Sequence, residues 1–377
     1  MKNNIINIII PVKNRYDTLY FTLKNILSDN YTNLKVLVSD NSSLKNKEFY
    51  KSFNDERLKI IYTNSELEMH ENYEYALNNI NDGWVGFIGS DDGFIPGSIT
   101  YLNNLINIYN KIHAIRFSSN YYLWPDKKND YSKIILNSKN NITIRSSKKY
   151  LNKVIHGYID YDQLPLIYNG GFVKYDLLKN IYKKNKFFYS KCPDVYSGVA
   201  ISLNTNEYLY VNRPLFFYGS SVHSSGNSLH QTSGNLKQNT GAYDFFLKNN
   251  WHRNCPILIN KIPIRSLYVY FIESFFTACD IYNVAITKDN LKTIYISSLC
   301  YKSNDNINIK IWAKDFKKIN NIKYIANENL QILFYKIFKL KKLAINYLRK
   351  KIVVYKCKKI KNINDAMDYL RYVKKYM

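Results

Sequence analysis

Short β-branched runs alternate with stretches of helical spacing over the first 120 residues. The runs that predict strands are residues 5–12, 34–38, 58–62, 85–88 and 114–117. The stretches that predict helices are residues 17–27, 45–53, 68–80 and 99–109. Because helices separate successive strands, we expect an α/β fold with right-handed crossovers and a largely parallel sheet, buried on both sides. Such a sheet binds ligands just beyond the carboxyl ends of its strands.

The alternation is lost after residue 120. Residues 120–160 are expected to form an insertion or a lid. A helix at 176–182 and a strand pair at 208–211 and 215–218 restore order, and from residue 242 onward the pattern is mainly helical. We therefore divide the chain into residues 1–120, 121–240 and 241–377.

Neither a membrane-spanning nor a disulfide-rich protein is expected. No apolar run reaches the roughly 18 residues that a bilayer-spanning helix needs. The apolar run at residues 5–10 is too short for the core of a signal peptide and is typical of a buried strand. The five cysteines are scattered, without a CxxC pair or a zinc-like spacing to histidine. We expect a cytoplasmic protein without disulfides or structural zinc.

The chain is globular in composition and strongly basic. Hydrophobic residues make up 46% and charged residues 22%, which excludes a disordered chain. The 54 Lys and Arg against 29 Asp and Glu leave a net charge of +25. This favours anionic partners, namely nucleoside diphosphates, acidic lipid headgroups or nucleic acid.

Three acidic features are candidates for chemistry, and the first is Asp40-Asn41-Ser42-Ser43 after the second strand. A carboxylate there can accept hydrogen bonds from a nucleobase or a ribose. Asp, Asn and Ser are also the commonest turn formers, so the motif taken alone favours a turn.

The second feature is Gly89-Ser90-Asp91-Asp92-Gly93, after the fourth strand. Adjacent carboxylates repel each other unless a cation or a donor lies between them. Mg²⁺ and Mn²⁺ take one or two carboxylates together with substrate phosphates, and flanking glycines let a diphosphate approach the backbone. The alternative is a turn before the helix that follows Pro96. The strand-end position favours a metal site.

The third feature is Asp194, which follows Pro193 at the start of a helical stretch. Its spacing alone favours a helix N-cap over a catalytic base. His223 lies in a Gly/Ser loop whose composition suits closure over a phosphate or a sugar.

These sites occur in the order of a known family. The chain resembles glycosyltransferase family 2, which has the GT-A fold, well over residues 5–120 and more loosely over 165–227. The matching stretches are IIIPVKNR at residues 8–15, VLVSDNSS at 36–43 and WVGFIGSDD at 84–92.

The resemblance implies roles for individual residues. Pro11, Asn14 and Arg15 would line the nucleotide pocket, Asp40 would bind the nucleobase, and Asn72 would also contact the donor. Asp91 would contact the ribose or the donor sugar, and Asp92 would ligate Mn²⁺ or Mg²⁺. Asp194 would deprotonate the acceptor, and His223 would be a second metal or phosphate contact. Residues 1–120 would bind the nucleotide sugar, 121–240 would hold the acceptor and the base, and 241–377 would form a helical basic region.

The sequence departs from the family pattern at three places. The usual segment after the third strand is replaced by residues 64–72, where Asn72 alone corresponds. The metal motif is Ser-Asp-Asp rather than Asp-x-Asp. Pro193-Asp194 replaces the usual Glu-Asp at the base.

The family implies an inverting, metal-dependent transfer from a nucleoside-diphosphate sugar to a glycan or lipid-linked glycan, as in synthesis of bacterial surface polysaccharide. A catalytically silent scaffold of a glycan-assembly complex is the alternative. A nucleic-acid-binding protein is disfavoured because no recognition motif is present, and we expect no specific nucleic acid partner.

The C-terminal region has a cationic segment. Between Lys336 and Lys361 there are 11 Lys or Arg and no Asp or Glu. The helical face predicted here is apolar and comprises Leu333, Ile337, Leu340, Ala344, Tyr347 and Leu348. This helix is expected either to lie on the cytoplasmic face of an anionic membrane, making the protein peripheral, or to pack on the catalytic domain.

Overall fold

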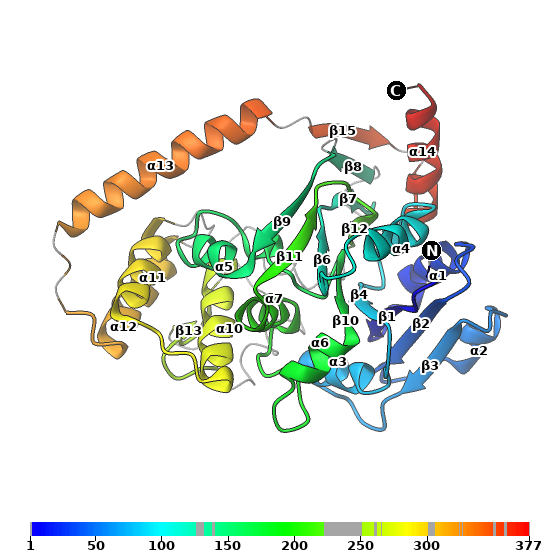
Figure 1. Cartoon of the computed structure of the whole chain (residues 1–377), viewed down its shortest axis with the longest axis horizontal. Helices are drawn as coiled ribbons and strands as arrows, with labels where there is room; N and C mark the ends of the chain where they lie inside the picture. The colour runs from blue at the N-terminus through cyan, green and yellow to red at the C-terminus, as the bar shows by residue number, and fades with distance from the viewer. Residues whose placement is uncertain are drawn as a thin grey trace.

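The computed structural model places two β-sheets at the centre of the molecule, with helices around them (Figure 1). It describes residues 2–125, 132–137, 140–221, 251–259, 262–264, 266–300, 306–323, 325, 327–349, 352–357 and 360–376.

The N-terminal part forms parallel strands joined by helices, as predicted. The strands are β1 (Ile6–Val12), β2 (Leu34–Asp40), β3 (Leu58–Tyr62) and β4 (Trp84–Phe87), in the order β3-β2-β1-β4. The helices are α1 (Tyr16–Leu27), α2 (Lys47–Lys51), α3 (Met69–Leu77) and α4 (Ser98–Ile108). Ile8 and Ile10 pack into one core and Ile9 into another, so β1 is buried on both faces. A parallel sheet covered on both faces requires this continuous apolar run.

The same sheet continues into the second segment of the chain. The added strands are β10 (Gly171–Lys174), β6 (Ala114–Phe117), β11 (Glu207–Val211) and β9 (Ile142–Ser146). β10 runs antiparallel between β4 and β6, β11 is parallel to β6, and β9 is antiparallel at the edge. Residues 1–120 and 121–240 therefore share one eight-stranded, mostly parallel sheet, in agreement with the expected fold class.

Residues 120–160, expected as an insertion or a lid, contain regular secondary structure where the structure describes them. They form β7 (Asn120–Leu123), β8 (Ser132–Asn137), β9 and α5 (Ser147–Ile155). β7 and β8 belong to a second sheet with β5 (Gly93–Phe94), β12 (Phe216–Ser220) and β15 (Ile352–Cys357), in the order β15-β8-β7-β12-β5. The expected strand pair is also corrected, because β11 and β12 lie in different sheets.

The described C-terminal part is mainly helical and closes back on the N-terminal half. Its helices are α10 (Leu267–Tyr282), α11 (Lys288–Cys300), α12 (Asn306–Ile319), α13 (Glu328–Arg349) and α14 (Ile363–Tyr376). α10 packs on α7 (Pro193–Asn204), and α14 packs on α1. The remaining short elements are η1 (Tyr161–Gln163), α6 (Tyr175–Ile181), β13 (Leu258–Ile259) and β14 (Ile262–Pro263). Among the helices of the described ranges, none has the length and apolar character to cross a bilayer.

Gly171 allows β10 to enter the sheet, and its replacement tests that requirement. A Cβ on Gly171 would lie 1.4 Å from the carbonyl oxygen of Leu166, a backbone atom that cannot swing aside. We expect Gly171→Ala to lower the free energy of unfolding by about 3 kcal/mol or more, at the upper end of overpacking costs. Gly97→Ala is the control. A Cβ at Gly97 would meet no atom within 4 Å, so only its left-handed backbone at φ +80° costs stability. We expect a loss of about 1–2 kcal/mol there. Urea denaturation measures both values, and equal losses would contradict the packing argument.

Candidate functional site

Two adjacent carboxylates are buried at the carboxyl end of β4. Asp91 and Asp92 are 5% and 1% exposed. The backbone N–H of Gly89 donates to Oδ2 of Asp92 at 2.6 Å, and that of Gly219 donates to Oδ1 at 2.7 Å. Both oxygens of Asp92 thus accept backbone hydrogen bonds, one from its own loop and one from β12.

Asp91 connects the same loop to the end of β12. Its Oδ2 accepts a hydrogen bond from the N–H of Ser221 at 3.2 Å, and its carbonyl oxygen accepts one from Trp124 Nε1 at 3.1 Å. A Cβ on Gly219 would lie 1.8 Å from that carbonyl oxygen, so this close approach of two backbones requires glycine.

The pair suits a cation. Burial raises the pKa of Asp92 well above its usual value, the charge of Asp91 raises it further, and the two backbone donors oppose both effects. Within the described ranges no group of three His, Cys, Asp or Glu side chains could hold a metal ion. A site with one or two carboxylates fits Mg²⁺ or Mn²⁺ when substrate phosphates complete the coordination. His223, expected as a further contact, lies outside the described residues.

Asp194 lies in the first turn of α7 and is not its N-cap, which is Cys192. The N-cap interpretation was therefore wrong. The hydroxyl of Tyr161 donates to Asp194 Oδ2 at 3.2 Å. Burial is the largest influence on Asp194 and raises its pKa, while hydrogen bonds from Val195 N–H and Tyr161 lower it.

Tyrosine side chains connect the three carboxylates. The pKa of Tyr218 is raised first by burial and then by the charges of Asp92, Asp91 and Asp194, which places all three carboxylates within electrostatic reach of one hydroxyl. Three further tyrosines have pKa values raised by burial and by one or more of these carboxylates: Tyr73, Tyr161 and Tyr168. Sequence analysis missed these residues, because 36 tyrosines along the chain give no single one a signal.

A buried glutamate of the C-terminal region supports the Asp194 turn. Glu273 of α10 is 3% exposed, and its Oε2 accepts a hydrogen bond from the Ser190 hydroxyl at 2.7 Å. Ser190 Oγ in turn accepts the backbone N–H of Cys192 at 3.2 Å. This chain of contacts holds the turn that begins α7 and so positions Asp194.

Asp40 lies at the carboxyl end of β2 and is fully buried. Its Oδ2 accepts hydrogen bonds from the hydroxyls of Tyr16 at 2.7 Å and Tyr50 at 3.0 Å, and its Oδ1 accepts the N–H of Ser42 at 2.9 Å. Asp40 therefore closes the turn after β2. It also holds two tyrosines of an aromatic cluster, in which the ring centroids of Tyr16 and Phe49 are 5.0 Å apart.

The loop after β1 is joined to the loop after β2. Asn14, at φ +55°, donates its N–H to Ser42 Oγ at 2.8 Å, and its Oδ1 accepts the N–H of Ser43 at 3.1 Å. Pro11 pairs in register with Ser39, and Arg15 is the N-cap of α1. The structure thus brings three of the predicted nucleotide contacts close to the Asp40 turn.

Asn72 is buried on α3 and faces β2. Its Oδ1 accepts a hydrogen bond from the Ser39 hydroxyl at 2.6 Å. This hydrogen bond joins α3 to β2 beneath the loops. The side-chain oxygen of Asn72 is therefore bound to the protein in this structure.

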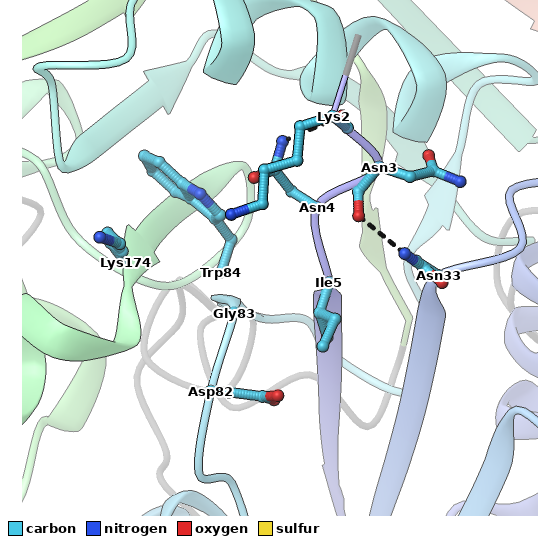
Figure 2. A pocket seen from close by; sticks show the side chains of 9 residues that line it. All are labelled: Lys2, Asn3, Asn4, Ile5, Asn33, Asp82, Gly83, Trp84 and Lys174. Atoms are coloured by element: carbon cyan, nitrogen blue, oxygen red, sulfur yellow. Dashed lines mark hydrogen bonds between the residues drawn. The ribbon is translucent and has the colours of Figure 1, made fainter.

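A pocket of about 340 Å³ lies at the opposite end of the sheet (Figure 2). It is lined by residues that precede the strands, among them Ile5 before β1, Asn33 before β2 and Gly83 before β4. Ligands of parallel sheets bind at the carboxyl ends, so this pocket is not the candidate site.

Comparisons with known proteins agree with the family suggested by the motifs. Residues 7–160 match the family model described as Glycosyl transferase family 2. The chain is similar to S. aureus TarS, with a TM-score of 0.45 and 13% identity over 91% of this chain and 54% of that one, so it spans about half the length of that protein. The crystal structure of S. aureus TarS 1-349 in complex with UDP-GlcNAc is similar with a TM-score of 0.46 and 12% sequence identity, and the match covers 92% of both chains. The Pyrobaculum calidifontis mannosyltransferase PcManGT, in complex with GDP-Man and Mn²⁺, is similar with a TM-score of 0.40 and 10% sequence identity. The match covers 92% of this chain and 88% of that one. No curated protein sequence matches.

The different partners of Asp91 and Asp92 predict opposite effects on stability. In Asp92→Asn the amide NH₂ would face one of the two backbone N–H groups, which would then lack an acceptor. We therefore expect the free energy of unfolding to fall by about 1–3 kcal/mol. Asp91→Asn removes the charge that repels Asp92 and keeps an oxygen for Ser221, so we expect unchanged or higher stability. Thermal and urea denaturation of the metal-free protein measure both. A larger loss for Asp91→Asn would contradict this assignment.

Proposed function

We propose that this chain, a glycosyltransferase whose residues 7–160 belong to family 2, moves a sugar from a nucleoside-diphosphate sugar to a hydroxyl of a glycan or lipid-linked glycan. The observation that carries the proposal is the pair of buried carboxylates at the end of β4; the charge of Asp194, like theirs, raises the pKa of Tyr218.

The diphosphate of the donor would lie over the loop of Asp91 and Asp92, with Mn²⁺ or Mg²⁺ between them. From the family resemblance we expected Asp92 to be the metal ligand and Asp91 to contact the ribose or sugar. Both oxygens of Asp92 also accept backbone hydrogen bonds, so Asp92 would hold the loop as well as ligate the cation, with the carboxylate of Asp91 beside it. A bound cation would supply charge neutralisation of the departing diphosphate.

The nucleoside would lie over the ends of β1 and β2, among Pro11, Asn14, Arg15 and the Asp40 turn. Asp40 is fully buried, so a direct contact with the base requires a residue that covers it, such as Tyr16, to move. The aromatic rings around Asp40 offer an apolar surface on which a base can lie.

Asp194 would act as the general base. Its carboxylate accepts the proton of the acceptor hydroxyl while that oxygen forms a bond to the anomeric carbon, and the bond from that carbon to the diphosphate oxygen breaks. This single displacement inverts the anomeric configuration. Tyr73 and the half-buried Tyr161, Tyr168 and Tyr218 would limit access of water, and Tyr161 would orient Asp194 through its hydroxyl.

The acceptor would be presented at an anionic surface, in the assembly of a surface polysaccharide. The segment from Lys336 to Lys361, with 11 cationic and no acidic residues, supports an acceptor held at the cytoplasmic face of a membrane.

Turnover tests the assignment of Asp194. We expect Asp194→Asn to lower kcat/KM by about 10²–10⁴-fold, as loss of a general base does. Release of nucleoside diphosphate from a panel of UDP, GDP, CDP and dTDP sugars measures it. Asp162→Asn is the matched control, because Asp162 is a neighbouring carboxyl whose pKa is also raised by burial. Equal loss in both variants, or no release of any nucleotide by the folded wild type, would contradict the proposal and favour a scaffold.

The pH profile gives an independent test. A general base works only when ionised, so activity falls as pH drops through the pKa of Asp194, which burial raises above its usual value. The acidic limb should therefore lie above the ordinary aspartate pKa of about 3.9. Tyr161→Phe removes a donor that lowers this pKa, so it should move the limb to still higher pH. A limb that does not move in this variant would contradict the role of Tyr161.

A further inference from the structure

One face of the helix α13 packs against the rest of the protein. Tyr295 donates its hydroxyl to Glu328 Oε1 at 2.7 Å, and Lys317 pairs with Glu328 Oε2 at 2.8 Å. About two turns further along α13, Tyr335 is 8% exposed and stacks on Tyr158 with ring centroids 5.4 Å apart. The first half of α13 is therefore held against the C-terminal helices, with Glu328 and Tyr335 on its inner face.

The opposite face of α13 is apolar and exposed. Five large hydrophobic side chains are between 50% and 68% exposed, and we call them the outer stripe: Leu330, Leu333, Phe334, Ile337 and Leu340. At about 3.6 residues per turn the outer stripe lies on the side of the helix away from Glu328 and Tyr335. Isolated exposed hydrophobic residues are ordinary, but a contiguous row of them marks an interaction surface.

The sequence that contains and follows the outer stripe is cationic. Lys336 is exposed beside it, and from Lys336 to Lys361 the sequence carries no acidic residue. α13 runs along the periphery of the molecule, and only its C-terminal end approaches a sheet, at β15 (Figure 1). The helix can therefore meet a flat surface without any rearrangement of the catalytic part.

We propose that α13 lies in the interface of an anionic membrane, with the outer stripe among the acyl chains and the cationic residues at the headgroups. Apolar side chains beside lysines are the composition of helices that lie in a membrane interface. The inference rests on the proposed function only for its choice of partner, a membrane that would present the acceptor. The sequence left open whether this helix meets a membrane or packs on the protein, and its two faces allow both at once.

The charge argues against two other occupants. A second copy of the chain would bring two cationic segments together, and like charges across an interface cost binding energy. A nucleic acid would use the lysines but would leave the outer stripe exposed to water.

Vesicle binding by the full-length protein tests the inference. We expect co-sedimentation with vesicles of phosphatidylcholine and phosphatidylglycerol, about tenfold or more tighter than with phosphatidylcholine alone. The double variant Leu333→Asp/Phe334→Asp should lose about tenfold or more of this binding, because it places charges in the acyl region. Ile108→Asp is the matched control, since Ile108 is 67% exposed on α4, and it should bind as the wild type does.

Three results would overturn the inference. They are no binding to anionic vesicles, equal binding by the double variant, and a concentration-dependent dimer, dispersed by the double variant, in place of vesicle binding. Nucleoside diphosphate binding by the same preparations separates this question from the proposed function. If vesicle binding is absent while nucleotide binding is retained, the membrane inference for α13 fails and the proposed function stands. If nucleotide binding is absent, the proposed function at the end of β4 fails.

Discussion

The burial of two adjacent carboxylates at the carboxyl end of β4 is the constraint on which the rest of the site depends. Asp91 and Asp92 can be removed from water together because backbone N–H groups of Gly89, Gly219 and Ser221 point at them. Two of these donors come from β12 and the residue after it, so the second sheet has to lie against the first for the site to exist. Burial, and after it the charge of Asp91, raises the pKa of Asp92, and strongly shifted carboxylates of this kind are typical of functional sites.

The third carboxylate, Asp194, is positioned by helices and not by a strand end. Asp194 is carried on α7, and the turn before α7 is held by Ser190 and the buried Glu273 of α10. Glu273 has its pKa raised by burial and keeps its carboxyl oxygens occupied by Ser190 and Thr277. The C-terminal helices therefore contribute to the site, because Glu273 of α10 holds the turn that carries Asp194.

The parallel part of the sheet could be predicted because its strands are buried on both faces and its helices have one apolar face. β7, with the sequence Asn-Tyr-Tyr-Leu, carries no such pattern, and the pairing of β8 with β15 joins residues more than two hundred positions apart. The strand-end positions of Asp40, Asp91 and Asp92 were visible in the sequence. Their partners were not, because Gly219, Ser221, Tyr16 and Tyr50 approach only in the folded chain. The same holds for the tyrosines near the three carboxylates and for the outer stripe, whose exposure depends on which face of α13 the protein covers.

Calorimetric titration of the purified protein with UDP, GDP, CDP and dTDP, with Mn²⁺ and with a chelator, tests the central claim most directly. The account predicts micromolar binding of one nucleotide that requires Mn²⁺ and is lost in Asp91→Asn, a variant that should remain folded. Binding of none of the four by the folded protein, or equal binding in the presence of the chelator, would contradict a cation-bridged diphosphate at the end of β4.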